Sequence, residues 1–120
     1  MAAQVLSVSA ESLRPNVVII FADDMGYTDV GCFGAEGWKT PYMDQLAAEG
    51  MALTNFHVAQ AVCSASRAAL LSGAYSQRTG ILGALFPHSR HGMPEAIVTL
   101  PEMLKAEGYA TSMVGKWHLG

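Results

Sequence analysis

The chain has 120 residues, of which 51% are hydrophobic and 14% are charged, a balance that is typical of a globular domain and excludes a disordered tail. Seven Lys and Arg against ten Asp and Glu give a net charge of −3, which argues against a nucleic-acid binder. The longest apolar run, residues 17–22, is too short to span a membrane.

Residues 1–13 lack the basic start and the complete apolar stretch of a signal peptide. Residues 8–10, V-S-A, nevertheless have the small-residue spacing of a cleavage site. We therefore interpret residues 1–13 as an N-terminal tail that could be the remnant of a signal peptide. This favours a periplasmic or secreted protein over a cytoplasmic one, although the localisation stays open.

The apolar run at residues 17–22, V-V-I-I-F-A, does not alternate with polar residues, as in a strand buried on both faces. Such strands form parallel sheets with helices on both sides, and ligands bind beyond the carboxyl ends of the strands. Asp23 and Asp24 follow at that end. Two adjacent carboxylates repel each other unless a cation lies between them, and their oxygens suit calcium or magnesium. A solvated turn explains this spacing equally well.

A helix is predicted after the glycine-rich loop at residues 28–39. Thr40 is its cap, Pro41 its first residue and Gly50 its stop signal. Residues 51–58 alternate well enough for a second strand. A strand, a helix and a strand in this order predict a right-handed parallel unit.

The next predicted helix begins at Cys63, and Arg67 follows four residues later, so both side chains share one face. The unpaired N–H groups and partial positive charge at a helix N-terminus favour an anion there. A thiol, a fixed cation and a helix dipole thus predict a nucleophile site that binds an oxyanion. The alternative is a buried, inert cysteine, which is the commoner case for such a residue alone.

Residues 75–98 are rich in glycine and proline and predict a long loop beside the site. His88 and His91 have the spacing of a metal pair, but without partner ligands we favour a surface loop. T-L-P-E at residues 99–102 has the capping-box pattern, which predicts a further helix up to the glycine at position 108.

A third strand is predicted at residues 109–114, followed by G-K-W-H-L-G. Lys116 and His118 would therefore also lie beyond the carboxyl end of a strand. A lysine there can bind an anion, and a histidine can exchange protons near neutral pH. Considered alone, each is more often a structural or solvated residue.

Three strings in the right order resemble the signatures of the sulfatases, formylglycine-dependent enzymes of the alkaline phosphatase superfamily. They are D-D-M-G-Y at 23–27, C-S-A-S-R-A-A-L-L-S-G at 63–73 and G-K-W-H-L-G at 115–120. The resemblance implies an α/β fold with a mostly parallel sheet flanked by helices. It also implies that residues 14–120 are the incomplete N-terminal portion of a sulfatase catalytic domain.

Two positions depart from the family pattern C-x-P-S-R-x-x-x-L-T-G-R. Ala65 stands where proline is usual, which resembles the sequence accepted by the oxygen-independent maturation system, so the maturase stays open. Ala74 stands where arginine is common, and Arg78 could replace that cation.

The resemblance implies hydrolysis of a sulfate monoester, on a small molecule or a carbohydrate. A maturase would convert Cys63 to formylglycine, whose hydrated aldehyde is the nucleophile, and Arg67, Lys116 and His118 would act with it on the sulfate. Asp23, Asp24 and the converted Cys63 would bind Ca²⁺, with Mg²⁺ as the less favoured ion.

Two other functions stay open. The first is a phosphate or phosphonate monoester hydrolase of the same superfamily, and the second is a non-catalytic fragment in which Cys63 is not converted. The family's later calcium ligands and leaving-group residues do not occur in this sequence, so we expect the 120 residues alone to be inactive. The identity of the ester is not predicted.

Overall fold

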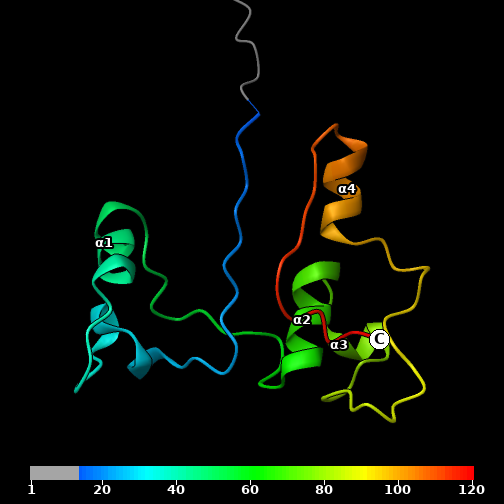
Figure 1. Ribbon diagram of the computed structural model, residues 1–120, viewed down its shortest axis with the longest axis horizontal. Helices are drawn as coiled ribbons and strands as arrows, with labels where there is room; N and C mark the ends of the chain where they lie inside the picture. Colours follow the sequence, from blue (N-terminus) through cyan, green and yellow to red (C-terminus); the bar gives the residue numbers. More distant parts are fainter. Residues whose placement is uncertain (1–13) are drawn as a thin grey trace, which may run out of the picture.

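The computed structural model describes residues 14–120, and the interpretation of residues 1–13 as a tail lies outside them. Two 3₁₀ turns and four helices follow in chain order: η1 (Tyr27–Asp29), η2 (Gly31–Phe33), α1 (Pro41–Glu49), α2 (Cys63–Ser72), α3 (Ser76–Thr79) and α4 (Leu100–Ala106). The extended N-terminal segment lies between α1 on one side and α2 to α4 on the other (Figure 1). None of the helices in the described part has the length and hydropathy that crossing a bilayer requires.

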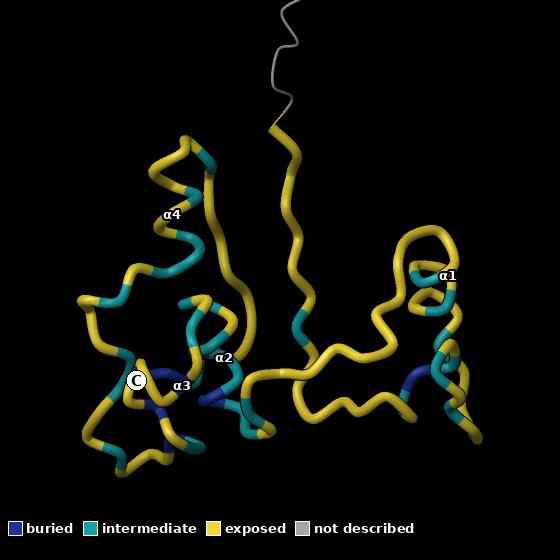
Figure 2. Tube along the Cα trace, turned by 180° about the vertical axis from the view of Figure 1, so that it is seen from behind, coloured by how far each residue is buried: buried dark blue, intermediate teal, exposed yellow. Residues whose placement is uncertain are grey.

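The prediction of strands at residues 17–22, 51–58 and 109–114 is wrong for the described chain. No backbone hydrogen bond joins these segments, the second of them contains a turn at residues 54–55, and residues 14–120 contain no strand. Val18 and Ile20 are 82% and 85% exposed, and Figure 2 shows this segment as exposed over most of its length. A strand is stabilised by a hydrogen-bonded neighbour, and the apolar pattern alone does not supply that neighbour.

Helix α1 has the predicted bounds, with Pro41 at its first position and Gly50 at its end. The Asp44 carboxylate in its first turn accepts hydrogen bonds from the Cys32 N–H at 2.7 Å and the Thr40 hydroxyl at 3.0 Å. These bonds attach the glycine-rich loop to the helix N-terminus, where an acidic group is favoured.

The Tyr27 hydroxyl connects the chain after Asp24 to the segment that leads toward α2. It accepts a hydrogen bond from the Phe56 N–H at 2.7 Å and donates to the Phe56 carbonyl at 2.6 Å. Both contacts use the backbone of Phe56, so they fix the path of the chain at that point.

Helix α2 begins at Cys63, as predicted, and ends at Gly73, whose φ of 63° is the left-handed conformation that favours glycine. Its buried face is made of small residues and packs against the part of the chain for which a loop was predicted. The core cluster consists of Ala65, Ala68, Ile81, Leu85 and Leu119. The short helix α3 was not predicted and lies inside the segment, residues 75–98, for which a loop was expected.

Helix α4 begins after Thr99, as the capping-box pattern predicts. The Thr99 backbone N–H and hydroxyl both donate to the Glu102 carboxylate, at 2.7 and 2.6 Å. These bonds, first that of the hydroxyl and then that of the N–H, hold the pKa of Glu102 below its ordinary value of 4.5. The carboxylate therefore stabilises the helix at neutral pH, and this contribution is lost as the pH falls through the lowered pKa.

We expect Thr99→Ala to increase amide hydrogen exchange in α4 about fivefold at neutral pH, because the hydroxyl no longer fixes the Glu102 carboxylate. The difference from the wild type should shrink as the pH falls through the lowered pKa of Glu102, where its carboxylate becomes protonated. Thr111→Ala, at an exposed position, is the matched control. Equal exchange in both variants would contradict the capping role.

Candidate active site

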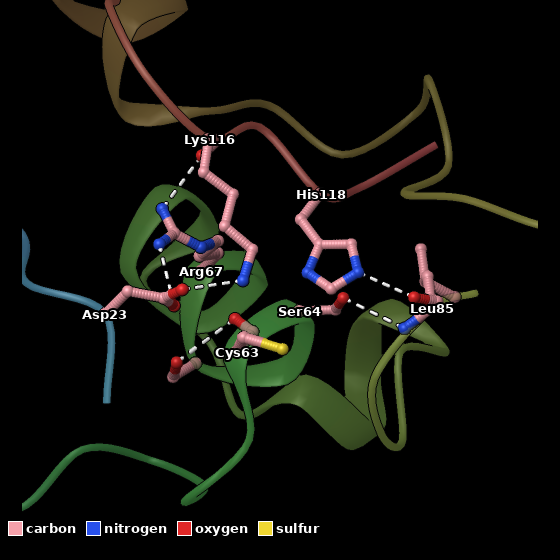
Figure 3. Close-up of polar contacts among 8 residues, drawn as sticks. Asp23, Cys63, Ser64, Arg67, Leu85, Lys116 and His118 are labelled. Atoms are coloured by element: carbon pink, nitrogen blue, oxygen red, sulfur yellow. Dashed lines mark hydrogen bonds and ion pairs between the residues drawn. The ribbon is translucent and has the colours of Figure 1, made fainter. Parts of the chain in front are cut away.

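The Asp23 carboxylate binds two cations from distant parts of the chain (Figure 3). Its Oδ2 lies 2.7 Å from the Lys116 Nζ, and its Oδ1 lies 3.1 Å from the Arg67 Nη2. The Arg67 Nη1 also donates to the Lys116 carbonyl at 2.9 Å. The structure thus joins the end of the first extended segment, helix α2 and the last segment of the chain.

These contacts stabilise the charged forms of the two partners. The hydrogen bond from Lys116, and after it the one from Arg67, lowers the pKa of Asp23 from 3.8. The hydrogen bond to Asp23 raises the pKa of Lys116 from 10.5. The lowered pKa favours the ion pair above pH 3.8 and the raised pKa favours it below pH 10.5, so both groups are charged throughout the neutral range.

Arg67 has the least exposed side chain of the three residues in this cluster. Its side chain is 11% exposed, whereas those of Asp23 and Lys116 are 41% and 42% exposed. Its Cζ lies 5.5 Å from the centre of the Phe21 ring, a cation–π distance. The guanidinium is therefore held by a carboxylate, a carbonyl and an aromatic face, which fixes its orientation.

Cys63 is the first residue of α2, and its thiol is free and partly buried. In Figure 3 it lies below the end of the Lys116 side chain, and it is near enough to contribute electrostatically to the raised pKa of Lys116, after Asp23. Its side chain lines an open cavity of about 860 Å³ that is also lined by Asp23 and Asp24. Such a position exposes residue 63 to a ligand in the cavity.

His118 is held from its other side by the loop after α3. Its Nε2 lies 2.6 Å from the Leu85 carbonyl oxygen, and the Leu85 N–H donates to the Ser64 hydroxyl at 3.0 Å. The Nδ1 atom is buried and makes no hydrogen bond within residues 14–120. Neither Ser64 nor Leu85 was predicted, although Ser64 lies inside the motif at its variable position.

Asp24 and His118 both have a φ of 57°. This left-handed conformation is uncommon for residues other than glycine, and such strained positions cluster at functional sites. Asp24 directly follows Asp23, and His118 lies two residues after Lys116. The strained positions are therefore next to the ion pair that joins the two segments.

Asp23 and Asp24 offer carboxylate oxygens, which are the type of donor that a hard cation prefers. Asp23 and Asp24 bring carboxylate oxygens to one cavity, and Asp24 makes no ion pair within residues 14–120. In the described part of the chain, no group of three or more His, Cys, Asp or Glu side chains is arranged to hold a metal. His88 and His91 are exposed, in keeping with the surface loop favoured for them.

Arg78 does not reach the cluster. It lines a different cavity of about 530 Å³, together with Ala74, and this cavity includes neither Cys63 nor Asp23. That Arg78 replaces the cation missing at position 74 stays a prediction.

Gly92 allows the chain around His118 to pack closely. A Cβ at this position would lie 2.5 Å from the Leu119 carbonyl oxygen and 3.0 Å from the Gly120 Cα, and both are backbone atoms that must then shift. The Leu119 carbonyl also accepts the Met93 N–H at 2.8 Å. The absence of a side chain at residue 92 thus allows this close contact with the segment that carries His118.

We expect Gly92→Ala to lower the free energy of unfolding by about 1–3 kcal/mol, because it overpacks this contact. Thermal unfolding of the full-length protein measures the effect. Gly83→Ala is the matched control in the same loop, since its Cβ would meet no atom within 4 Å. A loss of stability that is equal in both variants would show that the close contact is not the cause.

Comparison with known proteins gives a consistent result. The family model described as Sulfatase matches residues 15–120. Arylsulfatase A of Homo sapiens is 53% identical over 107 residues, which cover 88% of this chain and 21% of that protein. Steryl-sulfatase of Mus musculus is 45% identical over 112 residues, which cover 88% of this chain and 18% of that protein. The chain thus spans about a fifth of the length of these curated relatives.

A solved structure described as "Metabolism of multiple glycosaminoglycans by bacteroides thetaiotaomicron is orchestrated by a versatile core genetic locus (BT33336S-sulf)" has a similar backbone. Its TM-score is 0.84 at 44% sequence identity, and the match covers 91% of this chain and 23% of that chain. The helices and extended segments of residues 14–120 therefore follow the path that they take in a larger protein.

Proposed function

Because the chain belongs to the sulfatase family, we propose that it is the N-terminal portion of an enzyme that hydrolyses a sulfate monoester. The observation that carries this proposal is the joining of the first and last motifs by Asp23 and Lys116 at the N-terminus of α2, beside Cys63. A reactive position at a helix N-terminus, beside a carboxylate that binds two cations, is suited to a tetrahedral anion.

The nucleophile proposed here is formylglycine, made from Cys63 by a maturase. As a hydrated aldehyde it supplies one hydroxyl that attacks sulfur and a second that allows sulfate to leave. Arg67 and Lys116 would bind the sulfate oxygens and stabilise the charge that develops on them. His118 would accept a proton at Nδ1, the nitrogen that has no partner within residues 14–120.

We also propose that Asp23 and Asp24, with the oxygen of the converted residue 63, hold Ca²⁺ rather than Mg²⁺. The ion would polarise the sulfate oxygens and lower the proton affinity of the nucleophile. The support is the type of donor, since two carboxylates line one cavity with residue 63.

In the complete protein we propose an α/β fold with a mostly parallel sheet to which the extended segments contribute. Support comes from the exposed apolar side chains of residues 17–20 and from the match to less than a quarter of a sulfatase structure. We propose a periplasmic or secreted location, which rests on the V-S-A spacing at residues 8–10.

The test compares aryl sulfate with aryl phosphate as substrates of the full-length protein, co-expressed with a formylglycine-generating maturase. We expect kcat/KM to be higher for the sulfate, and chelation of calcium to lower it. The isolated 120-residue chain should show little turnover. A preference for the phosphate would favour a phosphate or phosphonate hydrolase, and an unconverted Cys63 in an inactive full-length protein would favour a non-catalytic function.

A further inference from the structure

The peptide bond between Leu85 and Phe86 is held at both of its polar ends. Its carbonyl oxygen, that of Leu85, lies 2.6 Å from the His118 Nε2 (Figure 3). Its N–H, that of Phe86, donates to the Ser89 hydroxyl at 2.9 Å. The C=O and the N–H of one peptide bond share a plane that does not rotate internally. The two hydrogen bonds therefore fix one rigid group, with the site histidine at one end and Ser89 at the other.

Ser89 is itself fixed by a tight turn. The Ser89 N–H donates to the Phe86 carbonyl at 2.8 Å, and Pro87 stands at the second position of this turn, where its restricted φ is favoured. The rings of Phe86 and His88 stack on each other, with centroids 5.8 Å apart and an interplanar angle of 4°. The Ser89 hydroxyl is therefore held in place to accept the Phe86 N–H.

The contact with the Leu85 carbonyl determines where the proton of the neutral His118 ring lies. A carbonyl oxygen only accepts hydrogen bonds, so Nε2 carries the proton and Nδ1 has the free lone pair. The Nδ1 atom is buried and has no partner within residues 14–120. In Figure 3 Nε2 points to the Leu85 carbonyl, and Nδ1 lies on the side of the ring that is turned to Lys116. The nitrogen that can accept a proton is thus on the side of the Asp23–Lys116 ion pair.

We propose that Ser89 is a positioning residue that acts through the Leu85–Phe86 peptide to keep the proton of His118 on Nε2 and leave Nδ1 free. The hydroxyl holds the orientation of the peptide plane. By accepting the N–H it also polarises the carbonyl of the same peptide, which makes that oxygen a better acceptor. The inference rests on the proposed function, because that function gives Nδ1 its role as the proton acceptor.

Loss of the Ser89 hydroxyl should weaken the contact with His118 without abolishing it. Phe86 is 60% exposed, so water can reach its N–H and partly replace the hydroxyl. Water does not hold the plane in one orientation, so the His118 Nε2 loses its fixed acceptor for part of the time, and the ring then populates both neutral tautomers. The tautomer with a proton on Nδ1 cannot accept one there, so the defect should lie in kcat more than in KM.

The experiment uses the full-length matured protein with ¹⁵N-labelled histidine, at a pH where titration shows the ring to be neutral, and His118→Asn assigns the signal. The wild type should show the Nε2–H tautomer. In Ser89→Ala we expect the Nε2 proton to exchange with water about fivefold faster, the effect of losing one hydrogen bond. The kcat for aryl sulfate, per mole of formylglycine, should fall about 5- to 10-fold, with less than about a twofold change in KM.

Ser89→Thr keeps the hydroxyl and should restore both the slow exchange and most of kcat. Ser112→Ala is the matched control, because it removes another serine hydroxyl at an exposed position outside the turn. It should change neither the exchange nor kcat. If Ser89→Ala does not fold, the nearly isosteric Ser89→Cys, whose thiol is a weak acceptor, carries the same expectation.

Three results would overturn the positioning role: an Nδ1–H tautomer in the wild type, an exchange rate of the Nε2 proton that Ser89→Ala leaves unchanged, or faster exchange with unchanged kcat. The histidine spectra do not depend on turnover. Faster exchange in Ser89→Ala, together with a wild type that has no activity on aryl sulfate, would therefore count against the proposed function and leave the structural link between Ser89 and His118 intact.

Discussion

Replacement of Cys63 by alanine should lower kcat for aryl sulfate by roughly 10⁴-fold or more in the full-length matured protein, because no nucleophile can form at residue 63. The residue begins α2 and lines the cavity that Asp23 also lines. Intact-mass analysis gives an independent measurement. Conversion of cysteine to formylglycine lowers the mass by about 18 Da, and the alanine variant should lack this difference.

Cys32 supplies the matched control for this experiment, since its thiol is exposed and free. Its backbone N–H, and not its sulfur, binds Asp44, so Cys32→Ala leaves that contact in place. We expect kcat to stay within about twofold of the wild type. If the Cys63 variant retained wild-type turnover, or if the active wild type had an unmodified mass, the proposed nucleophile would be wrong.

A serine at position 63 separates the two halves of the proposed reaction. Its hydroxyl can attack sulfur and release the alcohol, but it has no second hydroxyl to expel the sulfate. We expect Cys63→Ser to accumulate a stable sulfate ester, with a mass gain of about 80 Da after exposure to substrate. An unchanged mass would show that the remaining residues do not support the first transfer.

Helices α1, α2 and α4 could be predicted from the sequence because their ends depend on local signals. Pro41 and Gly50 bound α1, Gly73 ends α2 in a left-handed conformation, and Thr99 with Glu102 begins α4. Each signal acts within a few residues of the backbone groups that it satisfies. The strands could not be predicted in this way, because a ladder needs a partner that the periodicity of one segment does not identify.

In the candidate site, too, some features could be predicted from the sequence and others could not. Its charged residues belong to motifs, and the structure brings Asp23, Arg67 and Lys116 into direct contact. The hydrogen bond from the Leu85 N–H to the Ser64 hydroxyl has no sequence signal, because the loop that carries Leu85 returns to α2 from 21 positions further along the chain. The motifs thus indicated the charged residues that the structure brings together, whereas the contacts that support them were visible only in the structure.

After the loss of Cys63, the loss of Arg67 should have the second largest effect on activity. It donates to the Asp23 carboxylate and to the Lys116 carbonyl, and it packs against the Phe21 ring. Its removal takes a cation from the proposed sulfate site and also releases both neighbours. We expect Arg67→Ala to lower kcat/KM for aryl sulfate about 10³-fold, the effect of losing a fixed group that stabilises the transition state.

Arg67→Lys distinguishes charge from geometry, because a lysine keeps the charge but lacks the planar fork that binds Asp23 and the Lys116 carbonyl together. We expect this variant to lose most of the activity as well, since its single ammonium cannot hold both partners in place. Rates must be given per mole of formylglycine, because Arg67 lies inside the string that we propose a maturase reads.

Arg78→Ala is the matched control for Arg67, since Arg78 lies on α3, lines the other cavity and makes no ion pair within residues 14–120. The loss of this arginine changes the net charge equally but leaves the Asp23 cluster intact. Its kcat/KM should therefore remain within about twofold of the wild type. Equal losses in both variants would mean that Arg67 acts through the general field of the protein, and the proposed contact with sulfate would have to be abandoned.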